Sequence, residues 1–343
     1  PNPCYTFMKS TYIIAEAGVN HDGKLDIALR LVEEAKKANA DCVKFQTFKA
    51  SNLVTLNAPK AKYQLKVTDT KESQFEMLSS LELEKSDYKK LIKYCDDLNI
   101  DFMSTPYSKE DVDYLFDLGV NSFKISSGQL TEIPFLEHVA SFGLPIYLST
   151  GMSYFSEIFL AVEKIKNINS TLTLNILQCT TNYPSKIEDA NINVIKSLKR
   201  IPNVIVGYSD HVQNNFACYA AVAKGAKVVE KHFTLDKKMK GPDHSSSLDP
   251  KGFSELVKGI REIEKSLGSK TKQPTELEKL NIYGMKRSLV YSKAISKGEI
   301  LNENHFAFKR PFNGLSPNFQ IYFLGKKLNR NVELDELVSF DHL

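Results

Sequence analysis

Eight short apolar runs, each ending in polar or charged side chains, recur along this chain at fairly regular intervals, with helical patterns between them. A continuous apolar run is typical of a strand that is buried on both faces of a parallel sheet. Eight strand–helix units of this kind close into a (β/α)8 barrel, whose active sites lie at the carboxyl ends of the strands. The runs are TYIIAE (11–16), CVKFQ (42–46), DFMST (101–105), SFKISSG (122–128), IYLST (146–150), LNILQCT (174–180), VIVGYSD (204–210) and KVVEKH (227–232).

The chain is longer than the barrel alone requires. A barrel of this class takes about 250 residues, and the chain has 343. We therefore predict an α/β barrel domain over 1–268, a linker over 269–284, and a small β-rich domain over 285–343, where the pattern changes to short alternating runs. A domain so small has a marginal core of its own, so we expect it to pack on the barrel or on a second subunit.

Two connections differ from the others. Between Phe48 and Asp101 lie 52 residues, of which a predicted helix over 86–98 accounts for only a part. Long insertions without much structure of their own are commonly functional covers, so we expect this one over the active site. After the eighth run, the polar segment LDKKMKGPDHSSSLDP (235–250) predicts a mobile loop.

Charge and hydropathy disfavour nucleic-acid and membrane partners. The formal net charge is +4, spread along the chain, and no basic stripe with interleaved aromatic residues occurs. No apolar stretch approaches the roughly 20 residues of a membrane span. The N-terminal segment PNPCYTFMKS has no basic region followed by an apolar one, so secretion is not expected. A small-molecule substrate, weakly favoured to be anionic, fits this composition.

The cysteine pattern predicts a reducing compartment. The five cysteines are scattered, odd in number and without CxxC spacing, which favours reduced core thiols in a cytoplasmic protein. They are Cys4, Cys42, Cys95, Cys179 and Cys218.

Two histidines end the seventh and eighth runs. Neighbouring barrel strands could bring His211 and His232 to one divalent cation and leave coordination positions open for substrate and water. The alternative is that each is a hydrogen-bonding residue of the rim. The nearby acids Asp210 and Glu230 are predicted to point away from the rim, or to hydrogen-bond to a metal ligand and orient it.

Lysines and hydroxyls at the strand ends predict an anion site. An ammonium group inside an apolar run needs an anionic partner, because burying it alone is costly. The lysines and serines concerned are Lys44, Lys124, Lys231, Ser127, Ser149 and Ser209. Together they could surround a phosphate or carboxylate.

Salt bridges within the barrel are the alternative to that anion site. Lys231 could pair with Glu230, and Lys44 with Glu16, so that two lysines rather than three would contact a ligand. Glu16, at the end of the first run, could instead act as a general base or bind a sugar hydroxyl.

Taken together, ten motifs resemble the sialic acid synthase family, which includes bacterial N-acetylneuraminate synthases and their legionaminate and pseudaminate relatives. The resemblance covers about residues 11–338, and the C-terminal part resembles the antifreeze-like (SAF) domain of that family. The motifs are IIAEAGVNHDG (13–23), VKFQTFKA (43–50), STPY (104–107), FKISSGQ (123–129), LSTGM (148–152), CTTNYP (179–184), GYSDH (207–211), EKHFTLDK (230–237), GPDHSSSLDP (241–250) and KRPFNGLSP (309–317).

The resemblance implies that phosphoenolpyruvate condenses with an open-chain N-acetylmannosamine-type sugar and water to give N-acetylneuraminate and phosphate, with cleavage of the C–O bond of phosphoenolpyruvate. It also implies a divalent cation, typically Mn²⁺ with Mg²⁺ or Co²⁺ as alternatives, on His211 and His232. Glu16 and Lys44 are the further catalytic candidates. The implied phosphoenolpyruvate contacts are Lys44, Thr105, Lys124, Ser127, Ser149 and Ser209.

On the sugar side, the resemblance implies contacts from several strands and from a second subunit. In this family a domain-swapped homodimer brings an arginine, here Arg310, to the N-acetyl group in the partner's barrel. The implied sugar-binding residues are Gln46, Tyr107, Gln129, Thr181, Tyr183, Asp243 and Arg310.

Three positions depart from the family pattern and leave the identity of the sugar substrate open. Gln129 replaces a frequent Glu or Asp and cannot accept a proton as a base; Phe312 replaces a small residue, and Thr181 an Asn. The rival enzymatic interpretation is a legionaminic acid synthase that uses 2,4-diacetamido-2,4,6-trideoxy-mannose. A non-catalytic binding or polysaccharide-assembly protein is the alternative outside enzymes, and Gln129 is the one feature that favours it.

Overall fold

The computed structural model describes residues 10–343 apart from 62–63, 67 and 70, so Cys4 and nearly all of the N-terminal segment PNPCYTFMKS lie outside the described residues. The chain divides into two compact units, Pro1–Gly268 and Ser269–Leu343.

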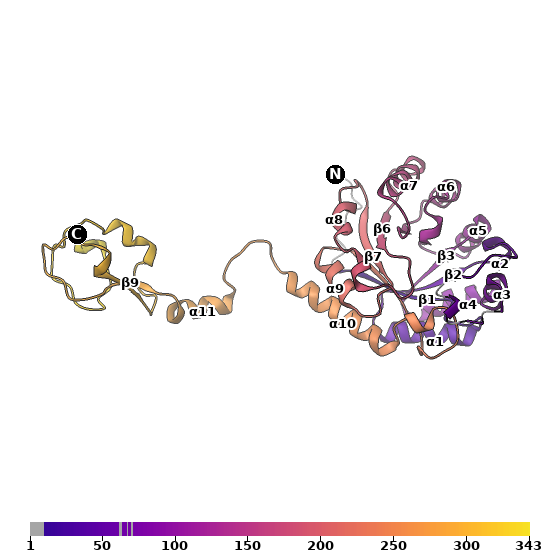
Figure 1. The fold of residues 1–343 in the computed structure, drawn as a ribbon, viewed down its shortest axis with the longest axis horizontal. Coiled ribbons are helices and arrows are strands. Elements are labelled where there is room, and N and C mark those ends of the chain that lie inside the picture. The colour runs from indigo at the N-terminus through magenta and orange to yellow at the C-terminus, as the bar shows by residue number, and fades with distance from the viewer. Residues whose placement is uncertain (1–9, 62–63, 67, 70) are drawn as a thin grey trace. The chain divides into compact units, whose positions relative to one another are not determined.

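Eight parallel strands form the first unit in the order β3-β2-β1-β8-β7-β6-β5-β4, and β3 and β4 at the two ends of this order also contact each other. Each apolar run of the sequence supplies one strand. This is the predicted (β/α)8 barrel, and Figure 1 shows its strands surrounded by helices. The strands are β1 (Tyr12–Gly18), β2 (Cys42–Thr47), β3 (Asp101–Pro106), β4 (Phe123–Ile125), β5 (Ile146–Ser149), β6 (Leu174–Cys179), β7 (Ile205–Asp210) and β8 (Val228–His232).

The helices that follow the strands pack an apolar stripe on the barrel. In the first helix, four residues at i, i+3, i+4 and i+7 spacing are all buried: Ala28, Leu31, Val32 and Ala35. The helices are α1 (Leu25–Lys37), α4 (Lys85–Leu98), α5 (Lys109–Asp117), α6 (Ile133–Ser141), α7 (Phe155–Ile168), α8 (Val194–Leu198), α9 (Phe216–Ala223) and α10 (Pro250–Leu267).

The barrel interior is apolar at one end and polar at the other. Because side chains alternate along a strand, every second residue faces inward. The inward residues near the amino ends form a separate buried apolar cluster, and those two or four positions later are polar. The cluster consists of Ile14, Cys42, Met103, Tyr147, Leu177 and Val228. The apolar layer therefore forms a floor beneath a polar mouth.

The long β2–β3 connection folds over the mouth. It contains α2 (Ala50–Leu53), a 3₁₀ turn at Gln64–Lys66 and α3 (Gln74–Ser80). A capping box between Ser73 and Glu76 starts α3. A small apolar cluster that includes Val19, Phe48, Met77 and Leu81 attaches the insertion to the barrel. The long insertion is therefore placed where the sequence predicted a cover.

The loop after β8 differs from expectation. The sequence predicted a mobile polar loop over 235–250, but the structure buries most of 242–248. Asn20 donates hydrogen bonds to the carbonyl oxygen of Phe233 and to Ser247 Oγ, both at 2.9 Å. His244 contacts Thr234 Oγ1 at 2.7 Å and Asp22 Oδ1 at 3.0 Å. These hydrogen bonds hold the second half of the loop in place, although its polar sequence predicted a mobile segment.

The second unit is a small β-rich domain with its own core. Strands β9 (Ser288–Tyr291) and β10 (Phe306–Lys309) pair antiparallel, and α11 (Glu276–Met285) precedes them within the segment predicted as a linker. The buried core consists of Leu289, Tyr291, Ile295, Leu301, Phe306, Phe323, Leu328, Val332 and Val338. The β-rich module that the sequence predicted after the barrel is therefore present.

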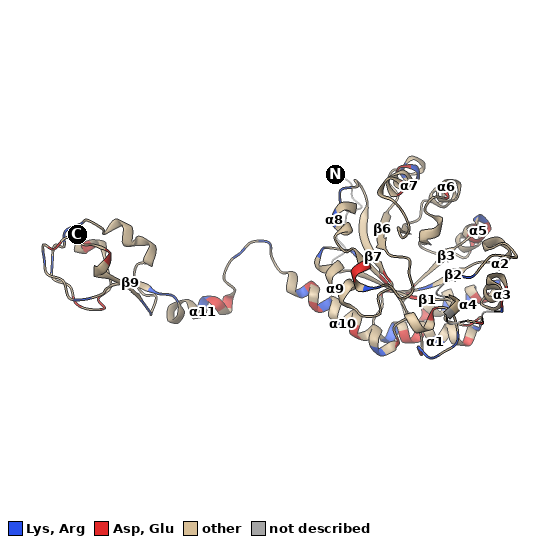
Figure 2. Cartoon of the chain, viewed as in Figure 1, with Lys and Arg blue, Asp and Glu red and all other residues tan. Residues whose placement is uncertain are grey.

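Charged residues of both signs occur on α10 and on α11 (Figure 2). Within the described part of the chain, no helix has both the length and the apolarity needed to cross a bilayer.

Candidate active site

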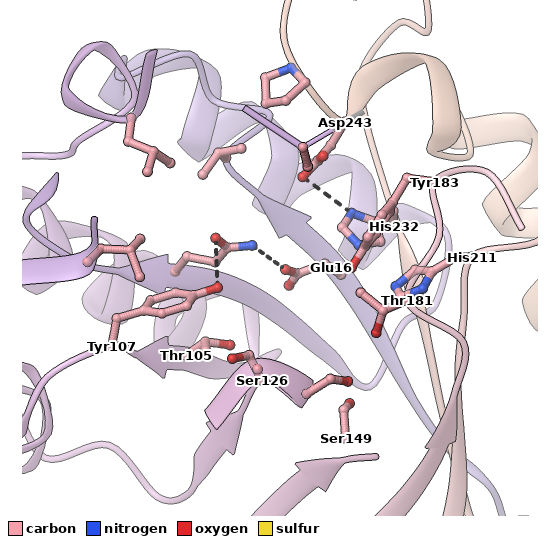
Figure 3. A pocket seen from close by; sticks show the side chains of 18 of the residues that line it. Glu16, Thr105, Tyr107, Ser126, Ser149, Thr181, Tyr183, His211, His232 and Asp243 are labelled. Carbon is pink, nitrogen blue, oxygen red and sulfur yellow. Dashed lines mark hydrogen bonds and ion pairs between the residues drawn. The ribbon is translucent and has the colours of Figure 1, made fainter. Parts of the chain in front are cut away.

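A cavity of about 330 Å³ opens at the carboxyl ends of the strands (Figure 3). It collects most of the residues that the sequence singled out, from all eight strands or the loops that follow them. The predicted residues that line it are Glu16, Lys44, Gln46, Thr105, Tyr107, Lys124, Ser127, Ser149, Thr181, Tyr183, Ser209, His211, His232 and Asp243.

The two histidine rings lie close together on one side of this cavity. The ring centroids of His211 and His232 are 5.3 Å apart, and the ring of Tyr183 packs against both. His211 Nδ1 lies 2.7 Å from the carbonyl oxygen of Thr180 and must donate to it, which leaves Nε2 with a free lone pair. Burial and the neighbouring His211 lower the pKa of His232 well below its usual value. Burial would lower the pKa of His211, but Cys179 and the hydrogen bond to the Thr180 carbonyl oxygen outweigh burial and raise it. His232 therefore presents a neutral nitrogen to a metal ion, and His211 can present Nε2 when that nitrogen is deprotonated.

The donor set fits a cation held by two imidazoles. The carboxylate of Asp243 approaches His232 Nδ1 at 3.9 Å, and its Oδ1 is buried without a hydrogen-bond partner among the described residues. No cluster of three or more His, Cys, Asp or Glu side chains suited to a metal occurs in the described ranges. The remaining coordination positions would therefore come from substrate or water, as in sites with open positions.

Two lysines and two glutamates meet at the centre of the mouth. Lys44 Nζ lies 2.8 Å from Glu16 Oε2, 3.7 Å from Glu230 Oε2 and 3.1 Å from Thr105 Oγ1. Lys124 Nζ lies 3.7 Å from Glu230 Oε1. All four charged side chains are nearly fully buried.

Their pKa values respond to burial and to one another. Burial alone would lower the pKa of Lys44, but Glu16 and Glu230 outweigh burial and raise it. Burial, aided by the like charge of Lys44, lowers the pKa of Lys124 despite Glu230. Burial and the like charge of Glu230 raise the pKa of Glu16 despite Lys44. Lys124, whose nearest carboxylate is 3.7 Å away compared with 2.8 Å for Lys44, is therefore the lysine most in need of an anionic ligand.

Hydroxyl groups surround the lysines. Ser127 Oγ accepts a hydrogen bond from the Gly151 amide at 2.9 Å, and Ser209 Oγ donates one to Glu230 Oε1 at 3.0 Å. Ser149 Oγ is buried and has no hydrogen-bond partner among the residues that the structure describes. Its hydroxyl is available to a ligand oxygen.

Two side chains differ from one branch of their predictions. Glu230 was expected to point away from the rim or to orient a ligand, and it faces the cavity because it lies two residues before His232 on the same face of β8. Lys231, between them, points out of the barrel and pairs with Asp210, so neither the three-lysine site nor a Lys231–Glu230 bridge forms. The alternative pairing of Lys44 with Glu16 is present, with two lysines at the site.

A chain of hydrogen bonds leads from the carboxylate to the cover. Gln46 Nε2 donates to Glu16 Oε1 at 3.0 Å, and the hydroxyl of Tyr107 contacts Gln46 Oε1 at 3.4 Å (Figure 3). Above them the wall is largely apolar and comes from the insertion and the β1 loop: Val19, Leu53, Val54, Met77, Leu78 and Leu81. Sequence reasoning placed the insertion over the mouth but did not identify these residues.

Two predicted sugar contacts do not line the cavity. Gln129 is buried in the turn after β4, where its Oε1 accepts a hydrogen bond from Ser126 Oγ at 3.0 Å. Arg310 belongs to the second unit, where its Nε donates to the carbonyl oxygen of Met285 at 3.0 Å. In the same unit Lys286 Nζ lies 5.7 Å from the ring centroid of Phe312. The predicted role of Arg310 in a partner's barrel stays a prediction.

The NeuB family model matches residues 31–272, and the SAF domain model matches residues 286–343. This chain belongs to the NeuB family. The family match confirms the resemblance drawn from the motifs, and the SAF match identifies the β-rich unit.

Several relatives are similar to this chain over most of their length. The N,N'-diacetyllegionaminic acid synthase of Campylobacter jejuni is 46% identical, over 96% of this chain and 99% of that protein. Human N-acetylneuraminate-9-phosphate synthase is 36% identical, over 95% and 91%. The crystal structure of the sialic acid synthetase of Leptospira borgpetersenii, 33% identical, covers 80% of this chain and 90% of that chain with a TM-score of 0.70.

Proposed function

We propose that this NeuB-family chain condenses phosphoenolpyruvate with an open-chain N-acetylated amino hexose and water to give a nonulosonic acid and inorganic phosphate. One observation carries the proposal: buried lysines and hydroxyls share a single cavity with two neighbouring imidazoles. The first group suits a small dianion or trianion, and the second suits a cation that contacts a carbonyl. The relatives are named as synthases of such acids.

Phosphoenolpyruvate would bind at the lysine end of the cavity. Lys124, whose nearest carboxylate is 3.7 Å away, and Lys44 would hold the phosphate and carboxylate groups. The buried hydroxyls would supply neutral hydrogen bonds that fix the enol in one orientation. They belong to Thr105, Ser127, Ser149 and Ser209.

The divalent cation that we propose, Mn²⁺ with Mg²⁺ or Co²⁺ as alternatives, would be held by His211 Nε2 and His232. When bound, it would supply Lewis-acid polarisation of the sugar aldehyde. The Thr180 carbonyl oxygen fixes the His211 tautomer, at an Nδ1–O distance of 2.7 Å.

The reaction forms a bond between C3 of phosphoenolpyruvate and the aldehyde carbon, while water adds at C2 and the bridging C–O bond breaks. Glu16 would bind a sugar hydroxyl or take up a proton from the attacking water. Of the two protons of that water, one would end on the aldehyde oxygen, which becomes a hydroxyl, and the other on the departing phosphate as C2 becomes a ketone. Lys44 and Gln46 hold both carboxylate oxygens of Glu16 at 2.8 and 3.0 Å, so the carboxylate is fixed before substrate arrives. The phosphate would leave with the bridging oxygen, next to the lysines.

Two sugars are candidate substrates, and the lining of the cavity favours the trideoxy sugar over N-acetylmannosamine. N-Acetylmannosamine would give N-acetylneuraminate, whereas 2,4-diacetamido-2,4,6-trideoxy-mannose would give legionaminate. The apolar wall, which includes Leu53, Met77 and Leu78, suits the methyl groups of the trideoxy sugar better than a hydroxymethyl group. The similarity to the Campylobacter jejuni enzyme points the same way.

Phosphate release from purified full-length chain tests both levels of this proposal. The chain is given phosphoenolpyruvate, Mn²⁺ and one sugar at a time, with mannose as a control that lacks the acetamido group. We expect release with an N-acetylated sugar and at least tenfold higher kcat/KM for the trideoxy sugar. Equal or better use of N-acetylmannosamine would overturn the sugar preference alone. Absence of release with both would overturn the function.

We also propose a homodimer in the cytoplasm, in which Arg310 of one subunit reaches the cavity of the other. The second unit carries Arg310 on an exposed segment after β10, and its guanidinium is bonded through Nε to a backbone oxygen. Light scattering on purified protein should give twice the monomer mass of 38.7 kDa. A monomer at micromolar concentration would contradict this arrangement.

A further inference from the structure

A buried ion pair lies on the outer face of the barrel, directly behind the two histidines. Asp210 and Lys231 are register partners on β7 and β8, and their carboxylate and ammonium groups are 2.5 Å apart. The exposed fractions of the two side chains are 0% and 2%. Each charged residue is the chain neighbour of one histidine, Asp210 of His211 and Lys231 of His232.

Strand alternation explains this mirrored arrangement. Residues that alternate along β7 and β8 point inward and outward in turn. Thus His211 and His232 face the cavity, and the residue before each faces the helices. The Asp210–Lys231 ion pair and the two histidines therefore belong to the same two short stretches of backbone.

The ammonium group of Lys231 also holds the turn that carries His211. It donates to the carbonyl oxygen of Val212 and, at 2.7 Å, to that of Asn214. With Asp210 this satisfies all three ammonium hydrogens. The main chain on both sides of His211 is thus tied to β8 from behind.

The carboxylate of Asp210 is equally saturated. Its Oδ1 accepts hydrogen bonds from the hydroxyl of Tyr208 at 2.7 Å and from the amide of Val212 at 3.0 Å. Its Oδ2 accepts one from the thiol of Cys218 at 3.2 Å, on α9. Nothing in the pair remains open for a ligand, so its role is within the protein.

Stability alone does not explain such a pair. Replacing a buried, hydrogen-bonded ion pair with well-packed apolar residues is often neutral or stabilising. The hydrogen bonds from this pair reach a strand, a turn and a helix. They fix the relative positions of these elements more closely than apolar packing would. Polar groups behind metal ligands commonly set their orientation, and losing such a group weakens metal binding about 10- to 100-fold.

We propose that Asp210 and Lys231 are positioning residues that fix the spacing and orientation of His211 and His232 for a shared divalent cation. This inference rests on the proposed function, because it presumes the two imidazoles as ligands. Breaking the pair should let the 211–214 turn move relative to β8 and separate the rings.

The test compares Lys231→Met and Asp210→Asn with Arg261→Met, in full-length protein. Arg261 pairs with Asp41 at 2.9 Å and donates to the Thr11 carbonyl oxygen, at the amino ends of the strands and away from the cavity. Mn²⁺ affinity is measured by electron paramagnetic resonance, folding by thermal unfolding, and the histidine tautomers by nitrogen-15 spectra of metal-free protein. We expect at least tenfold weaker Mn²⁺ binding and a mixed His211 tautomer in the first two variants. The control should bind as wild type.

Unchanged Mn²⁺ affinity and histidine spectra in both variants would overturn the positioning role. Equal weakening in Arg261→Met would also overturn it, since the effect would then be general destabilisation. Should wild-type protein bind no Mn²⁺, the cation assignment fails, and the metal-free spectra alone decide whether the pair orients His211. If Lys231→Met does not fold, the milder Asp210→Asn, which keeps the shape of the side chain, decides the question.

Discussion

The ammonium group of Lys44 lies 2.8 Å from the carboxylate of Glu16, between neighbouring strands and with both side chains almost completely buried. This contact places a fixed carboxylate between the lysine end of the cavity and the histidine side. Gln46 holds the second carboxylate oxygen of Glu16. In the proposed function, Glu16 takes up a proton and Lys44 supplies positive charge to the anionic substrate.

Replacing Glu16 with Gln should lower kcat strongly and change the KM for phosphoenolpyruvate little. The amide has a similar shape but cannot take up a proton, and a positioned acid or base contributes about 10²- to 10⁴-fold. Steady-state phosphate release measures both constants. Asp101→Asn, at the amino end of β3, is the matched control and should be unaffected. A kcat within threefold of wild type would refute the proton-handling role.

Replacing Lys124 with Met should raise the KM for phosphoenolpyruvate about 10- to 100-fold, because a charge-assisted hydrogen bond contributes about 1.5–3 kcal/mol. The sugar KM should stay within threefold. Lys124 Nζ otherwise contacts Glu230 at 3.7 Å and a backbone oxygen, so the methionine leaves no short ion pair broken. Equal changes in both KM values would mean that Lys124 does not mark the phosphoenolpyruvate end.

Changing Arg310 to Ala should raise the KM of the sugar far more than that of phosphoenolpyruvate. We expect at least a tenfold difference between the two effects, since the guanidinium is proposed to contact only the N-acetyl group. Arg330→Ala, in the same unit and paired with Glu336, controls for damage to that unit. Mixing Arg310→Ala with an inactive Glu16→Gln variant should restore activity if the contact crosses subunits. Failure to restore it would argue against the swapped arrangement.

The stability of the barrel should depend on pH through His21. Burial lowers the pKa of His21 to about 4 from 6.5, so between these values the unfolded chain binds more protons and stability rises with pH. Its contribution is complete above pH 6.5 and is lost as pH falls toward 4, by about 3 kcal/mol in total. Urea unfolding of His21→Asn should show a correspondingly flatter dependence between pH 4.5 and 6.5 than wild type. An unchanged slope in His21→Asn would contradict the assignment.

The sequence was sufficient for the strands and for most of the mouth, because parallel strands that are buried on both faces leave continuous apolar runs. It left the direction of Glu230 open, although counting back two residues from His232 would have fixed it. The cover residues Met77 and Leu78 could not be predicted, because no periodic pattern fixes how an insertion folds back. The Asp210–Lys231 pair depends on strand register, which a single sequence does not specify.

The fate of the bridging oxygen of phosphoenolpyruvate tests the central claim most directly. Phosphoenolpyruvate labelled with oxygen-18 at the C–O–P bridge is turned over with Mn²⁺ and the preferred N-acetylated sugar, and the released phosphate is analysed by mass. C–O cleavage predicts that the label leaves with the phosphate and that no phosphate forms without sugar. Label retained in the organic product, or release that is independent of sugar, would contradict a condensation at this barrel mouth.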